Sequence, residues 1–170
     1  MHKKLSKILP TLLLLTSAFL FFGCGEKQSI SGKIPSVTFK TYAGESLSMG
    51  EEDKQVTLLV FWATWCQPCL MEIPSLIVLH EKLHSSHFRV VAVNVDDPDG
   101  QKVKAIIRAN GIPYLVVYGS EAIMKQFGGI VALPTAFIIG KNGAIREKLQ
   151  GVHSEEDLEQ KVALALAAAE

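Results

Sequence analysis

An unbroken apolar run at residues 56–63 limits the possible folds of this chain more than any other segment. Strands with one exposed face alternate between apolar and polar residues, whereas this run (Val-Thr-Leu-Leu-Val-Phe-Trp-Ala) shows almost no alternation. A strand of this kind is buried on both faces, inside a sheet that other elements cover on both sides. Residues 67–84 follow with apolar side chains at nearly helical spacing, so we expect a helix soon after the strand ends.

Strands and helices alternate along the rest of the chain. Further strands are predicted at residues 37–42, 88–95, 135–139 and 144–149, and further helices at residues 99–110, at 120–127 and from Ser154 onward. Asn142-Gly143, between the last two strands, is a strong signal for a hairpin. This order predicts an α/β fold, a central mixed sheet flanked by helices, to which the hairpin adds antiparallel strands.

Two cysteines lie at the junction between the buried strand and its helix, in the motif Cys66-Gln67-Pro68-Cys69. Free backbone N–H groups and the helix dipole stabilise an anion at this end of a helix, so we expect a lowered pKa for the Cys66 thiol. Cys69 follows one turn later, within disulfide reach, so the pair can form and open a disulfide without a further cofactor. In this chemistry Cys66 attacks a disulfide and Cys69 resolves the mixed disulfide.

A zinc site is the alternative interpretation of this motif, because His80 and His84 follow it at zinc-finger-like spacing. His80 comes eleven residues after Cys69, which is roughly 16 Å along a helix that rises 1.5 Å per residue. One metal ion cannot reach both ends, and Pro74 bends a helix without reversing it. We therefore expect no metal site, with His80 and His84 on a solvated helix face and His153 on the surface.

The N-terminal residues predict export and a lipid anchor. Residues 1–23 combine a basic start, an apolar stretch and a final small residue, which is the pattern of a secretory signal peptide. The run Leu20-Phe21-Phe22-Gly23-Cys24 resembles a bacterial lipoprotein box, with Phe21 in place of the usual leucine. We therefore expect a lipidated Cys24 that holds the protein at the periplasmic or outer face of a bacterial membrane. An uncleaved signal anchor is the alternative.

The remainder of the chain divides into a tether and one domain. Residues 24–34 are predicted to be the lipidated cysteine with a polar tether, and residues 35–170 a single folded domain. Three of the 17 lysines and arginines lie before residue 10, which leaves 14 basic against 17 acidic residues after residue 24. This balance argues against binding to nucleic acid.

Taken together, these motifs resemble the thioredoxin superfamily and, within it, the TlpA/ResA-like extracytoplasmic thiol–disulfide oxidoreductases. The resemblance covers most of residues 35–170, with residues 61–69 (Phe-Trp-Ala-Thr-Trp-Cys-Gln-Pro-Cys) matching the active-site stretch. Residues 88–110 resemble a strand and helix that this branch inserts into the minimal fold, and Leu133-Pro134-Thr135 resembles its cis-proline loop. The resemblance implies contact with substrate for four residues: Trp65, Pro68, Leu133 and Pro134.

Two further positions bear on proton transfer in such a protein. General thioredoxins carry a buried aspartate six residues before the first cysteine, and this chain has Val60 there. The TlpA/ResA-like branch instead has a glutamate three residues after the second cysteine, which here is Glu72. The resemblance implies that Glu72 takes the proton of the Cys69 thiol or helps to position the substrate. A surface charge is the alternative for Glu72.

The function implied by the resemblance is that of an enzyme, a membrane-tethered thiol–disulfide oxidoreductase. It would reduce disulfides of exported client proteins, for example in cytochrome c maturation, and receive electrons from a membrane thiol donor. The alternatives are a dithiol oxidase and a thioredoxin-fold module that binds a metal or a protein partner without redox turnover. A peroxidase is disfavoured, because the sequence that surrounds the reactive cysteine of peroxiredoxins is not found here.

Overall fold

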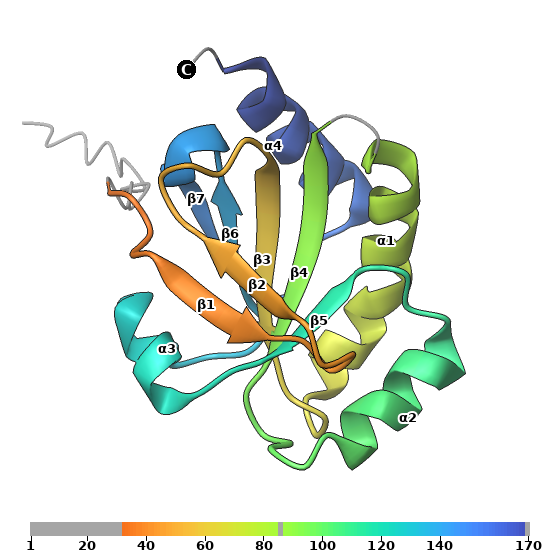
Figure 1. The fold of residues 1–170 in the computed structure, drawn as a ribbon. Coiled ribbons are helices and arrows are strands. Elements are labelled where there is room, and N and C mark those ends of the chain that lie inside the picture. Colours follow the sequence, from red (N-terminus) through yellow and green to blue (C-terminus); the bar gives the residue numbers. More distant parts are fainter. Residues whose placement is uncertain (1–31, 85–86, 169–170) are drawn as a thin grey trace, which may run out of the picture.

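The structure is a computed structural model that describes residues 32–84 and 87–168 of the chain. A five-stranded sheet forms its centre, with helices and a two-stranded hairpin packed on the two faces (Figure 1). The predicted signal peptide at residues 1–23 and Cys24 lie outside the described residues. Within the two described ranges, no helix is both long and apolar enough to cross a bilayer.

The buried strand predicted at residues 56–63 is β3 (Val56–Trp62), and all 7 of its residues are buried. It occupies the middle of the sheet, whose strand order is β5-β4-β3-β6-β7. β3 runs parallel to β4 (Phe88–Asn94) and antiparallel to β6 (Thr135–Ile139). Alternate side chains of β3 enter two separate cores, one on each face of the sheet, which confirms the predicted two-sided burial.

Three helices cover one face of the sheet, and the first of them begins at the cysteine motif. They are α1 (Gln67–Leu83), α2 (Gln101–Asn110) and α4 (Glu155–Ala167), and each contributes buried apolar side chains to the same core. α1 begins directly after the loop that follows β3, so the sheet determines where the cysteine motif lies.

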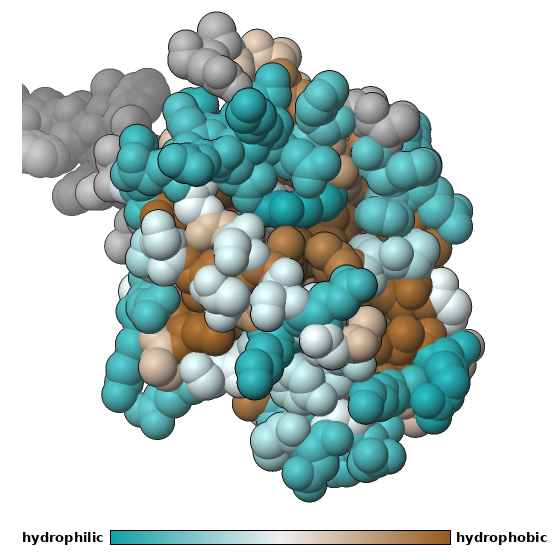
Figure 2. Space-filling model, in the orientation of Figure 1, coloured by the Kyte–Doolittle hydropathy of each residue, from teal (hydrophilic) through white to brown (hydrophobic). Residues whose placement is uncertain are grey.

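A short helix and a hairpin cover the other face. The helix is α3 (Glu121–Gln126), and the hairpin pairs β1 (Val37–Lys40) with β2 (Ser46–Met49) in antiparallel fashion. Figure 2, in the orientation of Figure 1, shows that apolar residues reach the surface here in patches separated by polar residues. The mixed sheet with helices on both faces confirms the predicted fold class.

The helix ends follow the signals in the sequence. Ser120 caps α3 by accepting the N–H of Ile123 at 3.2 Å, and Ser154 caps α4 by accepting the N–H of Asp157 at 3.2 Å. Gly111 ends α2 with a φ of 61°, a conformation that glycine adopts without steric cost. These local rules therefore place the helices correctly.

β6 and β7 (Ile145–Gln150) form the predicted antiparallel hairpin. The connection contains a short 3-10 turn, Lys141–Gly143, in which Asn142 and Gly143 have φ values of 71° and 74°. Asparagine and glycine are the residues that tolerate this left-handed conformation best. The Asn-Gly signal is thus confirmed, although the turn is longer than two residues.

The sequence analysis did not locate two short strands, β2 and β5 (Leu115–Tyr118). Each has 4 residues, too few to show a clear alternation of apolar and polar side chains. β2 depends on its pairing with β1, and β5 on its parallel pairing with β4. Their positions therefore follow from tertiary structure and not from local pattern.

The folded part begins slightly before the predicted boundary at residue 35. Ile34 is buried, and its N–H donates to the carbonyl of Gly143 at 2.8 Å. The N–H of Ile145 donates to the carbonyl of Gly32 at 2.9 Å. The end of the predicted tether is thus attached to the start of β7, because Ile34 has an apolar side chain to bury.

Candidate active site

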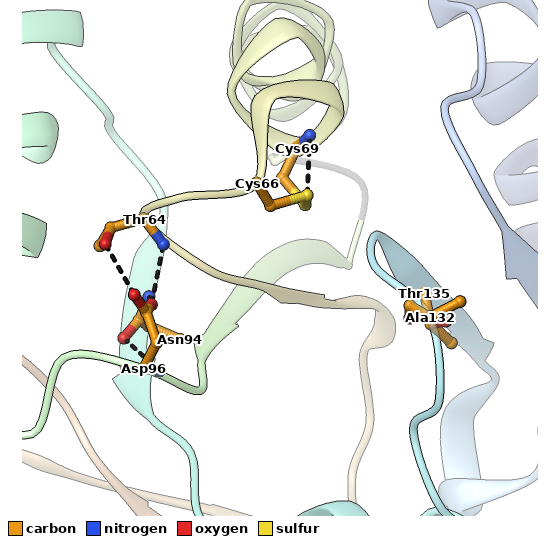
Figure 3. The surroundings of a disulfide bond; sticks show 7 residues. All are labelled: Thr64, Cys66, Cys69, Asn94, Asp96, Ala132 and Thr135. Atoms are coloured by element: carbon orange, nitrogen blue, oxygen red, sulfur yellow. Dashed lines mark hydrogen bonds between the residues drawn. A yellow bond between two sulfur atoms is a disulfide. The ribbon is translucent and has the colours of Figure 1, made fainter.

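Cys66 and Cys69 form a disulfide at the N-terminus of α1, where the sequence predicted the pair (Figure 3). Cys66 is the N-cap residue of α1, and its Sγ accepts the backbone N–H of Cys69 at 3.3 Å. Both cysteines are buried, with 4% and 3% of their surface exposed. The sulfur of Cys66 therefore occupies the end of the helix that stabilises a negative charge.

The residues that flank the cysteines are open to solvent. Trp65 is 69% exposed and Pro68, in the first turn of α1, is also exposed. Trp62, by contrast, is buried against the core. The two tryptophans of the active-site stretch thus differ, since Trp62 packs inside the domain and Trp65 presents an apolar surface beside the disulfide.

The loop before β6 lies near the end of β3 that leads to the cysteines. The Leu133–Pro134 peptide bond is cis, as predicted. Thr135 is the register partner of Phe61, so Pro134 comes level with the end of β3. Figure 3 shows Ala132 and Thr135 on one side of the disulfide and Thr64 on the other. Leu133 is half-buried, and the carbonyl of Pro134 accepts the N–H of Gly151 at 2.9 Å.

Val60 stands where the resemblance to thioredoxins places a buried aspartate, and it shares a small cavity with the second cysteine. Val60, Cys69 and Trp62 line one small cavity of about 10 Å³, with Tyr114 also in its wall. A valine offers no proton acceptor, so any base for the Cys69 thiol has to come from another element.

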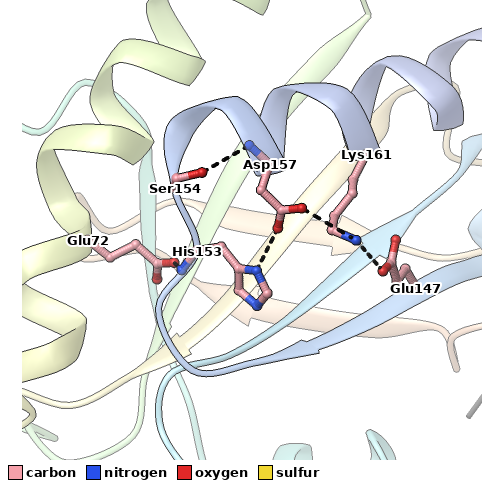
Figure 4. A network of polar contacts seen from close by, with 6 residues as sticks. All are labelled: Glu72, Glu147, His153, Ser154, Asp157 and Lys161. Atoms are coloured by element: carbon pink, nitrogen blue, oxygen red, sulfur yellow. Dashed lines mark hydrogen bonds and ion pairs between the residues drawn. The ribbon is translucent and has the colours of Figure 1, made fainter. Parts of the chain in front are cut away.

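Glu72 is buried, with 4% of its surface exposed, so the alternative of a surface charge is wrong. It lies on α1, one turn beyond Cys69, and its Oε1 accepts the backbone N–H of His153 at 3.0 Å (Figure 4). Burial raises the pKa of Glu72 above its ordinary value, and the contacts with His153 offset only part of this effect. The site therefore favours a Glu72 that holds its proton more tightly than an exposed glutamate.

His153 is a member of the site that sequence analysis missed, having placed it on the surface. It is half-buried, and its Nδ1 lies 2.7 Å from Oδ2 of Asp157. Lys161 lies 3.7 Å from Asp157 and 2.6 Å from Glu147, which extends the network to β7 (Figure 4). The four-residue spacing from His153 to Asp157 on a predicted helix start is a signal that could have revealed this pair.

Asp96 is the second residue that sequence analysis did not place at the site. Its Oδ1 accepts the backbone N–H of Thr64 at 2.8 Å, and its Oδ2 accepts the Thr64 hydroxyl at 2.7 Å (Figure 3). Burial acts to raise the pKa of Asp96, but hydrogen bonds from Thr64 and Asn94, with Lys102 nearby, outweigh it and hold the pKa below its ordinary value. Asp96 is thus an ionised group bonded to the loop before Cys66.

The histidines on α1 do not combine with the cysteines. His84 is exposed as predicted, but His80 is half-buried, and its ring contacts the edge of Tyr114 and stacks on His84. Burial and the neighbouring His84 lower the pKa of His80. In the part of the chain that the structure describes, no three His, Cys, Asp or Glu side chains group together as a candidate metal site.

Comparison with known proteins places this geometry among thiol–disulfide exchange proteins. Residues 30–148 match the AhpC/TSA family. The thiol-disulfide oxidoreductase ResA of Bacillus cereus is 26% identical over 140 residues, which cover 82% of this chain and 80% of that protein. The sporulation thiol-disulfide oxidoreductase A of Bacillus subtilis is 28% identical over 159 residues, which cover 91% of this chain and 95% of that protein.

Solved structures agree with these relatives. A thiol:disulfide interchange protein of the thioredoxin family from Chlorobium tepidum superposes with a TM-score of 0.74 at 28% identity, covering 81% of this chain and 97% of that one. StoA from Bacillus subtilis superposes with a TM-score of 0.66 at 29% identity, covering 75% of this chain and 96% of that one.

Proposed function

Because the chain belongs to the AhpC/TSA family of thioredoxin-like proteins and is a thiol–disulfide oxidoreductase, we propose that it is a membrane-tethered reductase of disulfides in exported proteins. The observation that carries this proposal is the position of the Cys66–Cys69 pair at the N-terminus of α1, beside the exposed Trp65. Apocytochromes c that await haem attachment are the clients we propose first, because their haem-binding cysteines have to be reduced.

The proposed reaction begins with both cysteines reduced. The Cys66 thiolate attacks one sulfur of a client disulfide, the client S–S bond breaks, and the other client sulfur leaves as a thiolate. Cys69, after losing its proton, attacks the Sγ of Cys66, which releases the second client thiolate and forms the Cys66–Cys69 disulfide. Two electrons have then passed to the client, and a dithiol donor has to restore them. We propose a membrane thiol transporter for this step.

The assignment of the two cysteines rests on the start of α1. Cys66 is the N-cap, and the N–H of Cys69 points at its Sγ, so a thiolate at Cys66 receives a hydrogen bond that favours the charged form. Cys69 lines the small internal cavity together with Val60, whereas Cys66 does not. This difference supports Cys66 as the attacking group and Cys69 as the resolving group.

Glu72 is proposed as the acceptor of the Cys69 proton. It lies one turn further along the same helix, and its buried carboxyl has a raised pKa. A carboxylate with a raised pKa is a better base near neutral pH than an exposed one. The reaction needs no cofactor other than the cysteine pair itself.

Four residues are proposed to contact the client: Trp65, Pro68, Leu133 and Pro134. Trp65 and Pro68 are exposed on the helix side of the disulfide, and the cis-proline loop lies on the β6 side. Val131, at the start of that loop, is 89% exposed. Leu133 is half-buried and Pro134 is buried, so the exposed apolar surface beside the disulfide comes from Trp65 and Pro68. Such a surface suits contact with a partially folded protein.

A trapping experiment tests the redox function. Cys69→Ser leaves the attacking thiol but removes the resolving one, so the variant should accumulate mixed disulfides with exported cysteine proteins. Cys66→Ser is the matched control and should trap none of them. The reductase direction is tested by the reduction potential of the Cys66–Cys69 pair, which we expect near that of thioredoxin, about −270 mV. A value close to that of a strong oxidant, about −120 mV, would reverse the proposed direction.

The lipid anchor has an independent test. The intact protein should be recovered in the membrane fraction and carry acyl chains on Cys24, while Cys24→Ser should lose both properties. Intact protein that is found without lipid would remove the lipid anchor from the proposal, but it would leave the cysteine chemistry untouched.

A further inference from the structure

The loop that follows β4 is bonded to the loop that precedes Cys66. Asp96 accepts two hydrogen bonds from Thr64, one from its N–H at 2.8 Å and one from its hydroxyl at 2.7 Å. Thr64 lies two residues before the attacking cysteine. Hydrogen bonds to an ionised carboxylate are shorter and stronger than those between neutral groups, so this contact holds the loop firmly.

The side chain of Asp96 is in turn fixed by a hydrogen bond from a buried residue, Asn94. The side-chain amide of Asn94 donates to Asp96 at 2.8 Å, and Asn94 has only 2% of its surface exposed. The carbonyl oxygen of the same amide accepts the hydroxyl of Tyr42 at 3.2 Å and the N–H of Asp97 at 2.9 Å. Both polar ends of Asn94 are thus bonded, which fixes the place from which Asp96 reaches Thr64.

The segment from Trp62 to Cys66 is consequently fixed at both ends. The carbonyl of Trp62 accepts the N–H of Val95 at 3.1 Å, and the N–H of Cys66 donates to the carbonyl of Ala63 at 3.1 Å. Thr64 is the midpoint of this segment, and Asp96 provides its side-chain anchor. If that anchor were removed, the segment would keep only its backbone bonds, which include the one from the N–H of Leu70 to the carbonyl of Cys66 at 3.1 Å.

We propose that Asp96 is a positioning residue for the thiolate of Cys66, acting through Thr64. The inference rests on the proposed role of Cys66 as the attacking thiol. The contact keeps Cys66 in its extended N-cap conformation, in which its Sγ receives the N–H of Cys69 at 3.3 Å. The loop between β4 and α2, which lies far from Cys66 in the sequence, thereby contributes to the reactivity of the dithiol.

The charge of Asp96 and its hydrogen bonds to Thr64 have opposite effects on Cys66, because a nearby anion opposes thiolate formation. The variants therefore have to change one while keeping the other. The charged and titratable groups beside Asp96 are Lys102 on α2, Asp97 in the same loop and Tyr42 after β1. Asp96→Asn removes the charge but keeps Oδ1 for the N–H of Thr64, while its amide can donate to the Thr64 hydroxyl. Asp96→Ala removes both the charge and the contacts, so the pair isolates the geometry.

A second pair of variants leaves the charge in place. Thr64→Ser keeps the hydroxyl that donates to Asp96, whereas Thr64→Val has nearly the shape of threonine and loses only that hydroxyl. The measurement for all four variants is the alkylation rate of Cys66 in the reduced full-length protein, followed by mass spectrometry of its peptide from pH 5 to 9. The midpoint of this pH profile reports the thiol pKa, and a melting temperature shows whether each variant folds.

We expect Asp96→Ala to react more slowly than Asp96→Asn at pH 7, on the order of threefold to tenfold, with a higher pH midpoint. Thr64→Val should be about twofold to fivefold slower than Thr64→Ser. Equal rates and midpoints within both pairs would overturn the inference, and should Asp96→Ala fail to fold, the Thr64 pair decides alone. A different measurement would reveal failure of the proposed function. In that case Cys69→Ser, in the otherwise unaltered protein, would trap no client.

Discussion

Replacement of Glu72 by glutamine should make the protein more stable at pH 8. The carboxylate of Glu72 is 4% exposed and receives the N–H of His153 at 3.0 Å. A hydrogen bond to a charged group contributes about 1.5–3 kcal/mol, whereas taking an ion out of water costs several kcal/mol even after the protein relaxes. Glutamine keeps an acceptor for His153 and has no charge to bury, so we expect a gain of about 1 kcal/mol.

The pH dependence of this gain follows from the direction of the pKa shift. Because burial raises the pKa of Glu72 above its ordinary value of 4.5, the folded state binds this proton more tightly than the unfolded state. The resulting stabilisation is complete below the unfolded value and is lost as the pH rises through the folded value. Glutamine does not titrate. The difference in unfolding free energy between the glutamine variant and the natural protein should therefore grow as the pH rises above 4.5, and it should become constant above the folded pKa of Glu72.

Urea unfolding of the oxidised protein at pH 4 and pH 8 measures both effects. The Glu72→Gln variant should differ from the natural protein at pH 8 and match it closely at pH 4, with an unchanged slope against urea. Glu81→Gln is the matched control, because Glu81 is an exposed carboxylate on the same helix. A variant that is less stable than the natural protein at pH 8, or an advantage equal at both pH values, would refute the reasoning about Glu72.

Three other changes have defined outcomes. Phe137→Ala should lower the free energy of unfolding by about 3–5 kcal/mol in urea titrations, because Phe137 is fully buried and contacts the rings of Phe61 and Phe127. Ser154→Ala should cost about 1 kcal/mol in the same assay, since it removes the N-cap of α4, while Ser154→Asp should not. Trp65→Ala should raise the KM for a client disulfide roughly tenfold and leave the Cys66 thiol pKa unchanged, because Trp65 is 69% exposed and is proposed to act only as a contact surface.

Local sequence rules predicted the cysteine motif and several strands and helices on either side of it. The apolar run that became β3, the helical spacing of α1 and the serine caps of α3 and α4 depend on neighbouring residues, so they can be recognised without the fold. Cys66 and Cys69 belong to this class, since strand, motif and helix follow one another directly.

The supporting contacts could not be predicted in the same way. Thr64 and Asp96 are 32 residues apart, and Glu72 and His153 are 81 residues apart. Thr64 meets Asp96 because β3 and β4 are parallel neighbours, so the loops after both strands emerge at the same end of the sheet. Sequence patterns identify β3 and β4 as strands but do not specify their order in the sheet, so only the structure shows which loop residues meet.

The two carboxyl groups of the site, Asp96 and Glu72, differ in their hydrogen bonds and in the direction of their pKa shifts. Asp96 receives three hydrogen bonds from Thr64 and Asn94, and its pKa is held below the ordinary value, so it remains an anion and suits a fixed anchor. Glu72 receives one hydrogen bond in an apolar setting, and its pKa is raised, so it suits the uptake and release of a proton. Carboxyl groups whose environments move their pKa values apart can hold different protonation states at the same pH. In the proposed mechanism, Asp96 would therefore keep Cys66 in position for attack, and Glu72 would accept the proton of Cys69 for resolution.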